Sequence, residues 1–119
     1  MNDQLLTQDM ATGQVVAAMD RIRANFVDGL GDRMLRIEAD WLAFKADRAS
    51  GAAFHAVVSD VHRIAGIAGS LGFKEIGESA VALDRRMQGV DPAHNPGAVI
   101  VDLDHRIEAF LDLLEDALG

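Results

Sequence analysis

Apolar residues recur at intervals of three and four along most of this chain, which is the spacing of one side of an α-helix. Four such series can be followed. They are Phe26, Leu30, Met34, Ile37, Trp41 and Phe44; Phe54, Val57, Val61, Ile64, Ala68 and Leu71; Ile76, Ala80, Leu83 and Met87; and Val99, Leu103, Ile107, Phe110, Leu114 and Leu118. Four one-sided helices bury their apolar sides by packing together. The predicted fold class is therefore all-α, an antiparallel four-helix bundle.

The first helix is predicted to begin near Gly13 and to end at about Asp47. Gly29 and Gly31 interrupt it, and each costs up to about 1 kcal/mol relative to alanine, so a kink or break is expected there. The domain division that follows is an N-terminal tail or short accessory helix over residues 1–12 and a bundle over residues 13–119.

Turn-forming residues separate the four series. Ser50 and Gly51 mark the start of the second helix, and Gly72 is predicted to end it as a left-handed cap. Asn95 followed by Pro96 predicts an N-cap with proline at the first helical position of the last helix.

Composition excludes several classes of protein. Eleven basic and nineteen acidic residues give a formal charge of −8, so neither nucleic acid nor an anionic membrane is expected as a partner. The chain has no cysteine, which excludes disulfides and thiolate metal sites. No apolar run approaches the roughly 20 residues that span a bilayer, and the N-terminal residues lack a signal peptide's pattern. We expect a cytoplasmic protein.

His62 is the residue that most suggests a function. At about 100° of rotation per residue, the apolar series of its helix lies about 100° to 160° away, so the imidazole is predicted to face solvent. Its neighbours on that side are mostly small: they are His55, Val58, Ser59, Ala65, Gly66 and Gly69. Because glycine weakens a helix interior, this pattern indicates close approach by a partner. The alternative is a solvated histidine beside glycines that serve helix packing.

The run from His62 to Phe73 resembles the signature of histidine-containing phosphotransfer (HPt) domains. That signature is His-x-aliphatic-Lys-Gly, with a small residue eight positions and a glycine ten positions after the histidine. The residues in register are Ile64, Gly66, Ser70 and Gly72, followed by Ile76, Leu83 and Asp84 in the next helix. The resemblance covers roughly residues 26–118 and implies a four-helix bundle.

What the resemblance implies is a phosphorelay carrier, not a stand-alone enzyme. His62 would accept a phosphoryl group from a receiver-domain aspartate, or from a hybrid histidine kinase, and pass it to another receiver. The docking surface would consist of Val58, Ser59, Ala65, Gly66 and Gly69. No cofactor of its own is expected, since the receiver brings Mg²⁺ and a lysine.

One position departs from the signature. Where the family usually has a lysine that helps to hold the phosphoryl oxygens, this chain has Ala65. Positive charge near a phosphorylated His62 would come from Arg63, from Lys74 or from the partner. The departure also keeps an alternative open, an HPt-like adaptor that binds receivers or another partner without phosphorylation.

Other constellations give weaker predictions. His55 and His62 share a face but lie about 10.5 Å apart along the helix axis, too far to ligate one zinc ion, so no metal site is expected. The final helix carries many carboxylates, which we interpret as a solvated face. These are Asp102, Asp104, Glu108, Asp112, Glu115 and Asp116.

Overall fold

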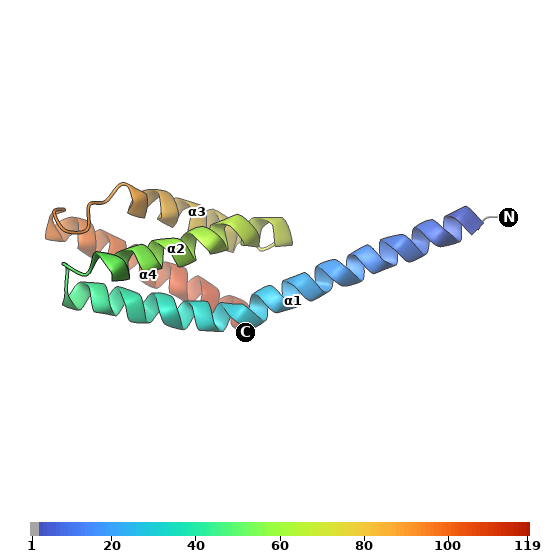
Figure 1. Ribbon diagram of the computed structural model, residues 1–119, viewed down its shortest axis with the longest axis horizontal. Coiled ribbons are helices and arrows are strands. Elements are labelled where there is room, and N and C mark those ends of the chain that lie inside the picture. The colour runs from blue at the N-terminus through green and yellow to red at the C-terminus, as the bar shows by residue number, and fades with distance from the viewer. Residues whose placement is uncertain (1–2) are drawn as a thin grey trace.

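The computed structural model describes the backbone of residues 3–119 and the side chains from Met10 onward. Four α-helices follow one another, and a short 3₁₀ turn, η1, continues the second. They are α1 (Asp3–Ala46), α2 (Gly51–Ala68), η1 (Gly69–Leu71), α3 (Lys74–Gln88) and α4 (Gly97–Leu118). The described residues contain no strand. Successive helices run in opposite directions (Figure 1), which confirms the predicted antiparallel four-helix bundle.

The apolar series form one core between the helices. All six residues of the second series and all four of the third are buried, as are most of the first and last. The final series is shifted at both ends: Val99 is only half-buried, Ile100 is buried in its place, and Leu118 is 39% exposed. Leu118 is the last helical residue, so no later turn covers it.

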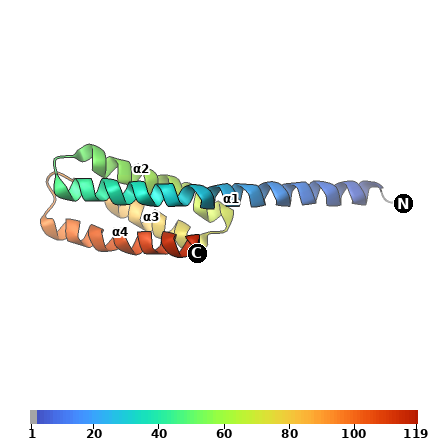
Figure 2. The ribbon, with the colours of Figure 1, turned by 90° about the horizontal axis from the view of Figure 1, so that it is seen from below.

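The first helix differs from its prediction at its beginning. It starts at Asp3, not near Gly13, and it continues through Gly29 and Gly31 without a break. No proline interrupts residues 3–46, and Leu30, fully buried between the two glycines, anchors the helix to the core. The N-terminal part of α1 projects beyond the bundle (Figure 2), and the molecule measures 71 × 23 × 22 Å. The division at residue 12 stays a prediction.

The turns position the ends of the other helices. Ser50 precedes α2, and Gly72 adopts φ +91°, the predicted left-handed cap, at the end of η1. The predicted cap of α4 is displaced by one residue, because Pro96 is the N-cap and the helix begins at Gly97. The Asn95 side chain instead accepts a hydrogen bond from the backbone N–H of Asp91 at 2.6 Å, which closes the preceding loop.

Within the described residues, no helix combines the length and the apolar character that crossing a membrane requires.

Candidate functional site

His62 projects from the middle of α2 and is held by a carboxylate of α3. Its side chain is 70% exposed, as its angular position predicts. The ring Nδ1 lies 2.7 Å from Oδ2 of Asp84, which is one of the least exposed polar residues of the bundle, at 8%. The other carboxylate oxygen, Oδ1, accepts a hydrogen bond from Nε2 of Gln88 at 2.9 Å. Asp84 therefore bridges the two side chains and ties the imidazole to α3.

The electrostatics of Asp84 decide which ring nitrogen of His62 carries the proton. Burial acts to raise the pKa of the Asp84 carboxyl, but the hydrogen bonds from Gln88 and His62 outweigh it, so this pKa lies below its ordinary value. An ionised carboxylate only accepts hydrogen bonds. In the neutral ring, Nδ1 is then the protonated nitrogen that donates to Asp84, and Nε2 keeps its lone pair. The exposed end of the ring is thus nucleophilic.

The surface beside the imidazole is low relative to the ring, because most of the residues that form it have small side chains or none. Ser59, Gly66 and Gly69 are exposed, and Val58 and Ala65 are half-buried against the core. A Cβ built on Gly66 or Gly69 would meet nothing within 4 Å outside its own helix. Helix packing therefore does not require glycine at these two positions, which removes the packing explanation for them.

Gly77 of α3 contrasts with these two glycines. It is buried, and a Cβ there would lie 3.0 Å from the backbone N and 3.1 Å from Cα of Gly69. The absence of a side chain lets α3 approach the end of α2 closely. This close approach contributes to the spacing of the two helices that carry His62 and Asp84.

The two predicted phosphate-contact residues lie in different surroundings. Arg63 is exposed on α2, next to His62. Lys74 begins α3, is 85% exposed, and lies 3.9 Å from Oε1 of Glu78. Lys74 and Arg85 both border a groove of about 370 Å³ along α3, whose opposite side is formed by Ala65 of α2 and Gly69 of η1. The position of the missing lysine thus faces a groove that contains cations from α3.

Asp84 is predicted from the sequence only through the family resemblance. Neither its contact with His62 nor the part played by Gln88 is predicted. A signal for Asp84 exists in the sequence. It follows Leu83 and stands four residues after Ala80, so an acid interrupts the apolar side of the third helix. An acid in that position needs a partner when the helix packs.

The other histidines are isolated from this arrangement. His55 is exposed, and the Phe54 ring meets it edge-on, with centroids 6.0 Å apart. His94 contacts Asp91 in the loop before α4. Within the part of the chain that the structure describes, no group of three or more histidine, aspartate and glutamate side chains could hold a metal ion.

A helical bundle in which an exposed histidine is oriented by a buried acid, as His62 is by Asp84, has the features of a small α-helical domain with a surface nucleophile. The model of the Hpt domain family matches residues 21–117, and the chain belongs to this family. Searches of curated proteins and of solved structures found no match. Family membership confirms the resemblance and supports a histidine phosphotransfer role in a phosphorelay; Hpt domains typically interact with receiver domains and kinases of two-component systems.

Proposed function

We propose that this domain carries a phosphoryl group on Nε2 of His62, received from a receiver-domain aspartyl phosphate or a hybrid histidine kinase and passed to another receiver. The observation that carries the proposal is the hydrogen bond between Nδ1 of His62 and Asp84, 2.7 Å long. It orients the ring and leaves Nε2, the nitrogen toward solvent, as the nucleophile.

The transfer balances as one in-line displacement. The Nε2 lone pair attacks phosphorus of the aspartyl phosphate, the N–P bond forms, and the P–O bond to the receiver aspartate breaks, its electron pair leaving with the carboxylate. The proton on Nδ1 stays in the hydrogen bond to Asp84. Because the ring becomes cationic as the N–P bond forms, the adjacent carboxylate stabilises the transition state and the product. The return transfer reverses each change.

The low surface around His62 supports docking of a receiver. Phosphoryl transfer requires the two reacting atoms to come within about 3 to 3.5 Å, so bulky side chains near the ring would prevent it. In this proposal Val58, Ser59, Ala65, Gly66 and Gly69 contact the receiver, and Arg63 and Lys74 approach the phosphoryl oxygens. The receiver supplies Mg²⁺ and further positive charge.

The experiment is phosphorylation of the whole chain by a labelled receiver domain. We expect an acid-labile label that is absent from His62→Gln and retained by His55→Gln, the matched control on the same helix. Asp84→Asn keeps the shape of the side chain but removes its charge, so labelling should slow by about tenfold, the low end for a hydrogen bond to a charged group.

Two results would contradict this mechanism. If His62→Gln still accepts label, His62 is not the acceptor. If the wild-type chain binds the receiver without ever acquiring label, and His62→Gln binds equally well, the domain is an adaptor. Asp84→Asn labelling at the wild-type rate would leave His62 as acceptor but remove the role of the carboxylate.

A further inference from the structure

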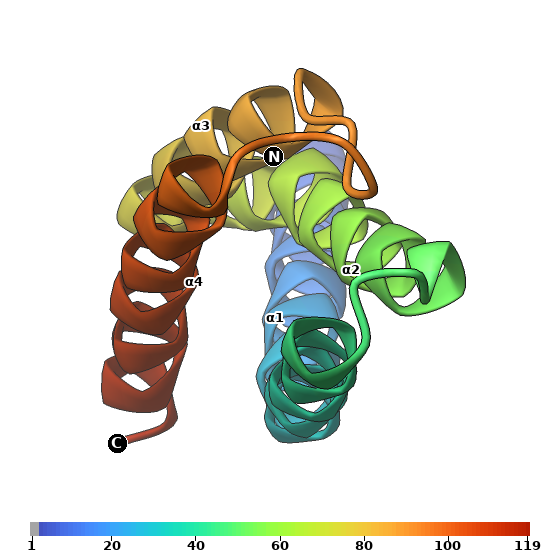
Figure 3. The same ribbon diagram turned by 90° about the vertical axis from the view of Figure 1, so that its left-hand side faces the viewer.

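A groove between α1 and α4 lies away from the helix pair that forms the His62 site. Its volume is about 430 Å³. The floor is apolar, formed by Met34 and Trp41 of α1 and by Ile107 and Leu111 of α4. Viewed along the bundle, α1 and α4 form its lower side, and α3 and the upper part of α2 form its upper side (Figure 3). A molecule bound in this groove would leave His62 accessible.

The rim of the groove is strongly acidic. Five carboxylates border it, and Lys45 is the one basic residue among the groove's lining. Lys45 is already engaged: its Nζ lies 2.8 Å from Oδ1 of Asp104, which also accepts a hydrogen bond from Nε1 of Trp41 at 2.8 Å. Asp104 is thus half-buried and paired. Asp102, also half-buried, pairs with Arg86 and Arg106, so the prediction that the acids of the last helix form a solvated face is wrong for these two.

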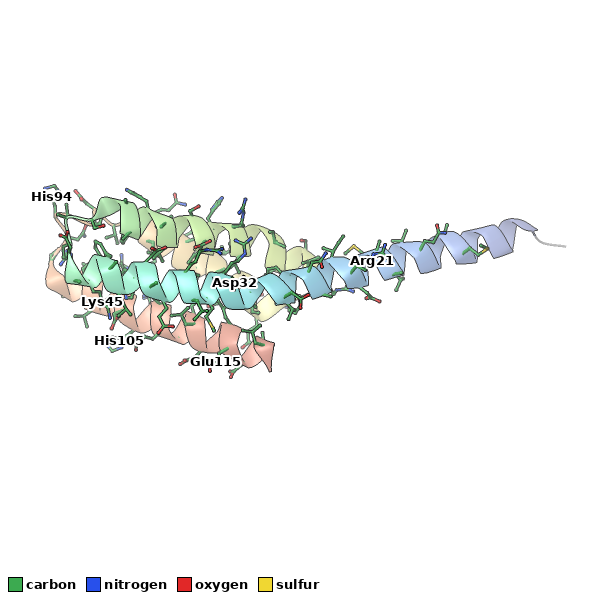
Figure 4. All side chains as sticks on the ribbon, turned by 60° about the horizontal axis from the view of Figure 1, so that its bottom comes forward. Arg21, Asp32, Lys45, His94, His105 and Glu115 are labelled. Carbon is green, nitrogen blue, oxygen red and sulfur yellow. The ribbon has the colours of Figure 1, made fainter. Side chains whose placement is uncertain are left out.

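Four rim carboxylates have no cationic partner among the side chains that the structure describes. They are Glu38, Glu108, Asp112 and Glu115, all exposed. Among the described residues, no lysine, arginine or histidine nitrogen lies within 4.0 Å of any of them. Figure 4 shows Lys45 on α1 and Glu115 on α4, toward opposite ends of the two helices that flank the groove. Most of its length therefore carries uncompensated negative charge.

The dimensions fit a helix. The lining residues extend from Met34 to Lys45 on α1 and from Asp104 to Glu115 on α4. At 1.5 Å per residue both stretches are about 17 Å long, which is about three helical turns. A helix with one apolar side would bury that side against Leu42 and Leu111, the more exposed apolar residues of the lining, and place its flanking residues beside the rim.

The negative charge of the rim determines which kind of helix the groove would bind. Lysine or arginine on the flanks would pair with the rim acids, whereas a polyanion such as nucleic acid would be repelled. A second copy of this chain fits less well, since the formal charge is −8. The exposed apolar part of α1, which includes Val15, Val16 and Ile22, brings only Arg21 and Arg23 as cations. Arg23 is already bound to Asp20 and to the Leu71 carbonyl.

We propose that the groove between α1 and α4 binds a basic amphipathic helix of about three turns from a partner protein, on a surface separate from the phosphotransfer site. Trp41 is the chain's one tryptophan, lies at the floor of the groove and donates a hydrogen bond to Asp104 on the rim, so its emission should change when the groove is occupied.

The test titrates the full chain with a synthetic helical peptide of about 14 residues, leucine on one side and lysine on the flanks. We expect a saturable change in Trp41 emission that weakens as salt is raised. A peptide with glutamate in place of lysine should not bind. The triple variant E108Q/D112N/E115Q should bind the lysine peptide about tenfold more weakly, as expected for three exposed charge pairs.

The matched control is D28N/D32N/E75Q, which removes the same charge at exposed positions outside the groove and should bind normally. Equal weakening in both triple variants would overturn the proposal, because net charge alone would then explain binding. It would also be overturned by the absence of peptide binding, by equal binding of the glutamate peptide, or by self-association that occupies the groove. Labelling of His62 by a receiver should persist in E108Q/D112N/E115Q, which keeps this test independent of the phosphotransfer proposal.

Discussion

Gly77→Ala is predicted to destabilise the bundle, although alanine is the better helix former. Gly77 lies within α3, where alanine gains up to about 1 kcal/mol over glycine. Against this gain stands a Cβ placed 3.0 Å and 3.1 Å from backbone N and Cα of Gly69 and 3.8 Å from the carbonyl carbon of Ala68. Favourable contacts between non-bonded heavy atoms lie near 3.5 to 4.0 Å, and backbone atoms of a helix cannot move individually.

The size of the effect follows from the helix propensity that alanine gains and the packing energy that the close contact with Gly69 costs. Overpacking of this kind costs typically about 1 to 3 kcal/mol, so Gly77→Ala should lose about 1 kcal/mol net of its helix gain. Gly66→Ala is the matched control in α2, where the new Cβ meets nothing within 4 Å. It should gain about 0.5 kcal/mol, because Gly66 lies in the last turn. The two Tm values should therefore differ by about 6 °C for a domain of this size.

The assay is thermal and urea unfolding followed by circular dichroism, with receiver-dependent labelling measured on the same samples. Gly77→Ala should also label more slowly, since a shift of α3 moves Asp84 away from His62. Gly66→Ala should unfold at a higher temperature yet label more slowly, because its methyl group would stand on the proposed docking surface for a receiver. Equal Tm values for the two variants would refute the packing argument. Normal labelling of Gly66→Ala would refute the close approach of a partner at that position.

Three further outcomes are expected. Arg23→Gln loses the 2.8 Å hydrogen bond from Nε to the Leu71 carbonyl, so the free energy of unfolding in urea should fall by about 1 kcal/mol. An unchanged urea midpoint would contradict this. Hydrogen bonds from Lys45 and Trp41 lower the pKa of Asp104 below its ordinary value of 3.8. The stability that these bonds contribute is therefore present above that pH and is lost as the pH falls through the pKa of the folded state. Lys45→Gln should flatten the acid limb of a curve of stability against pH, and an unchanged limb would contradict the pairing. Ala65→Lys should lengthen the lifetime of the phosphorylated chain, measured as label retained over time, and unchanged decay would show that a cation there does not reach the phosphoryl group.

The sequence predicts the helices well because burial along a helix repeats locally. The series that contains Val61 and Ile64 needs only the helical period to show which side faces the core, and the same period places His62 on the surface. The left-handed Gly72 is predictable for a similar reason, since glycine adopts that conformation without steric cost.

Contacts between helices are less accessible to sequence reasoning. The pairing of His62 with Asp84 depends on the register of α2 against α3, and this register depends in part on the close approach at Gly77, which no periodicity reveals. The start of α1 is unpredictable for a different reason: residues 10–17 are all exposed, so this part of the helix lacks the buried series that identifies the other helices.

A phosphoryl carrier has two charges to compensate, the positive charge of the phosphorylated ring and the negative charge of the phosphoryl group, and the surroundings of His62 treat them differently. Asp84 lies on the Nδ1 side of the ring and, in the proposed reaction, compensates the positive charge that the imidazole would gain on phosphorylation. The phosphoryl group proposed on the Nε2 side would have no lysine at position 65 to neutralise it. In the proposed reaction a docked receiver supplies that charge through Mg²⁺ and its own lysine. The complex then stabilises the transferring group more than the free phosphorylated domain does, which favours onward transfer whenever a receiver is docked.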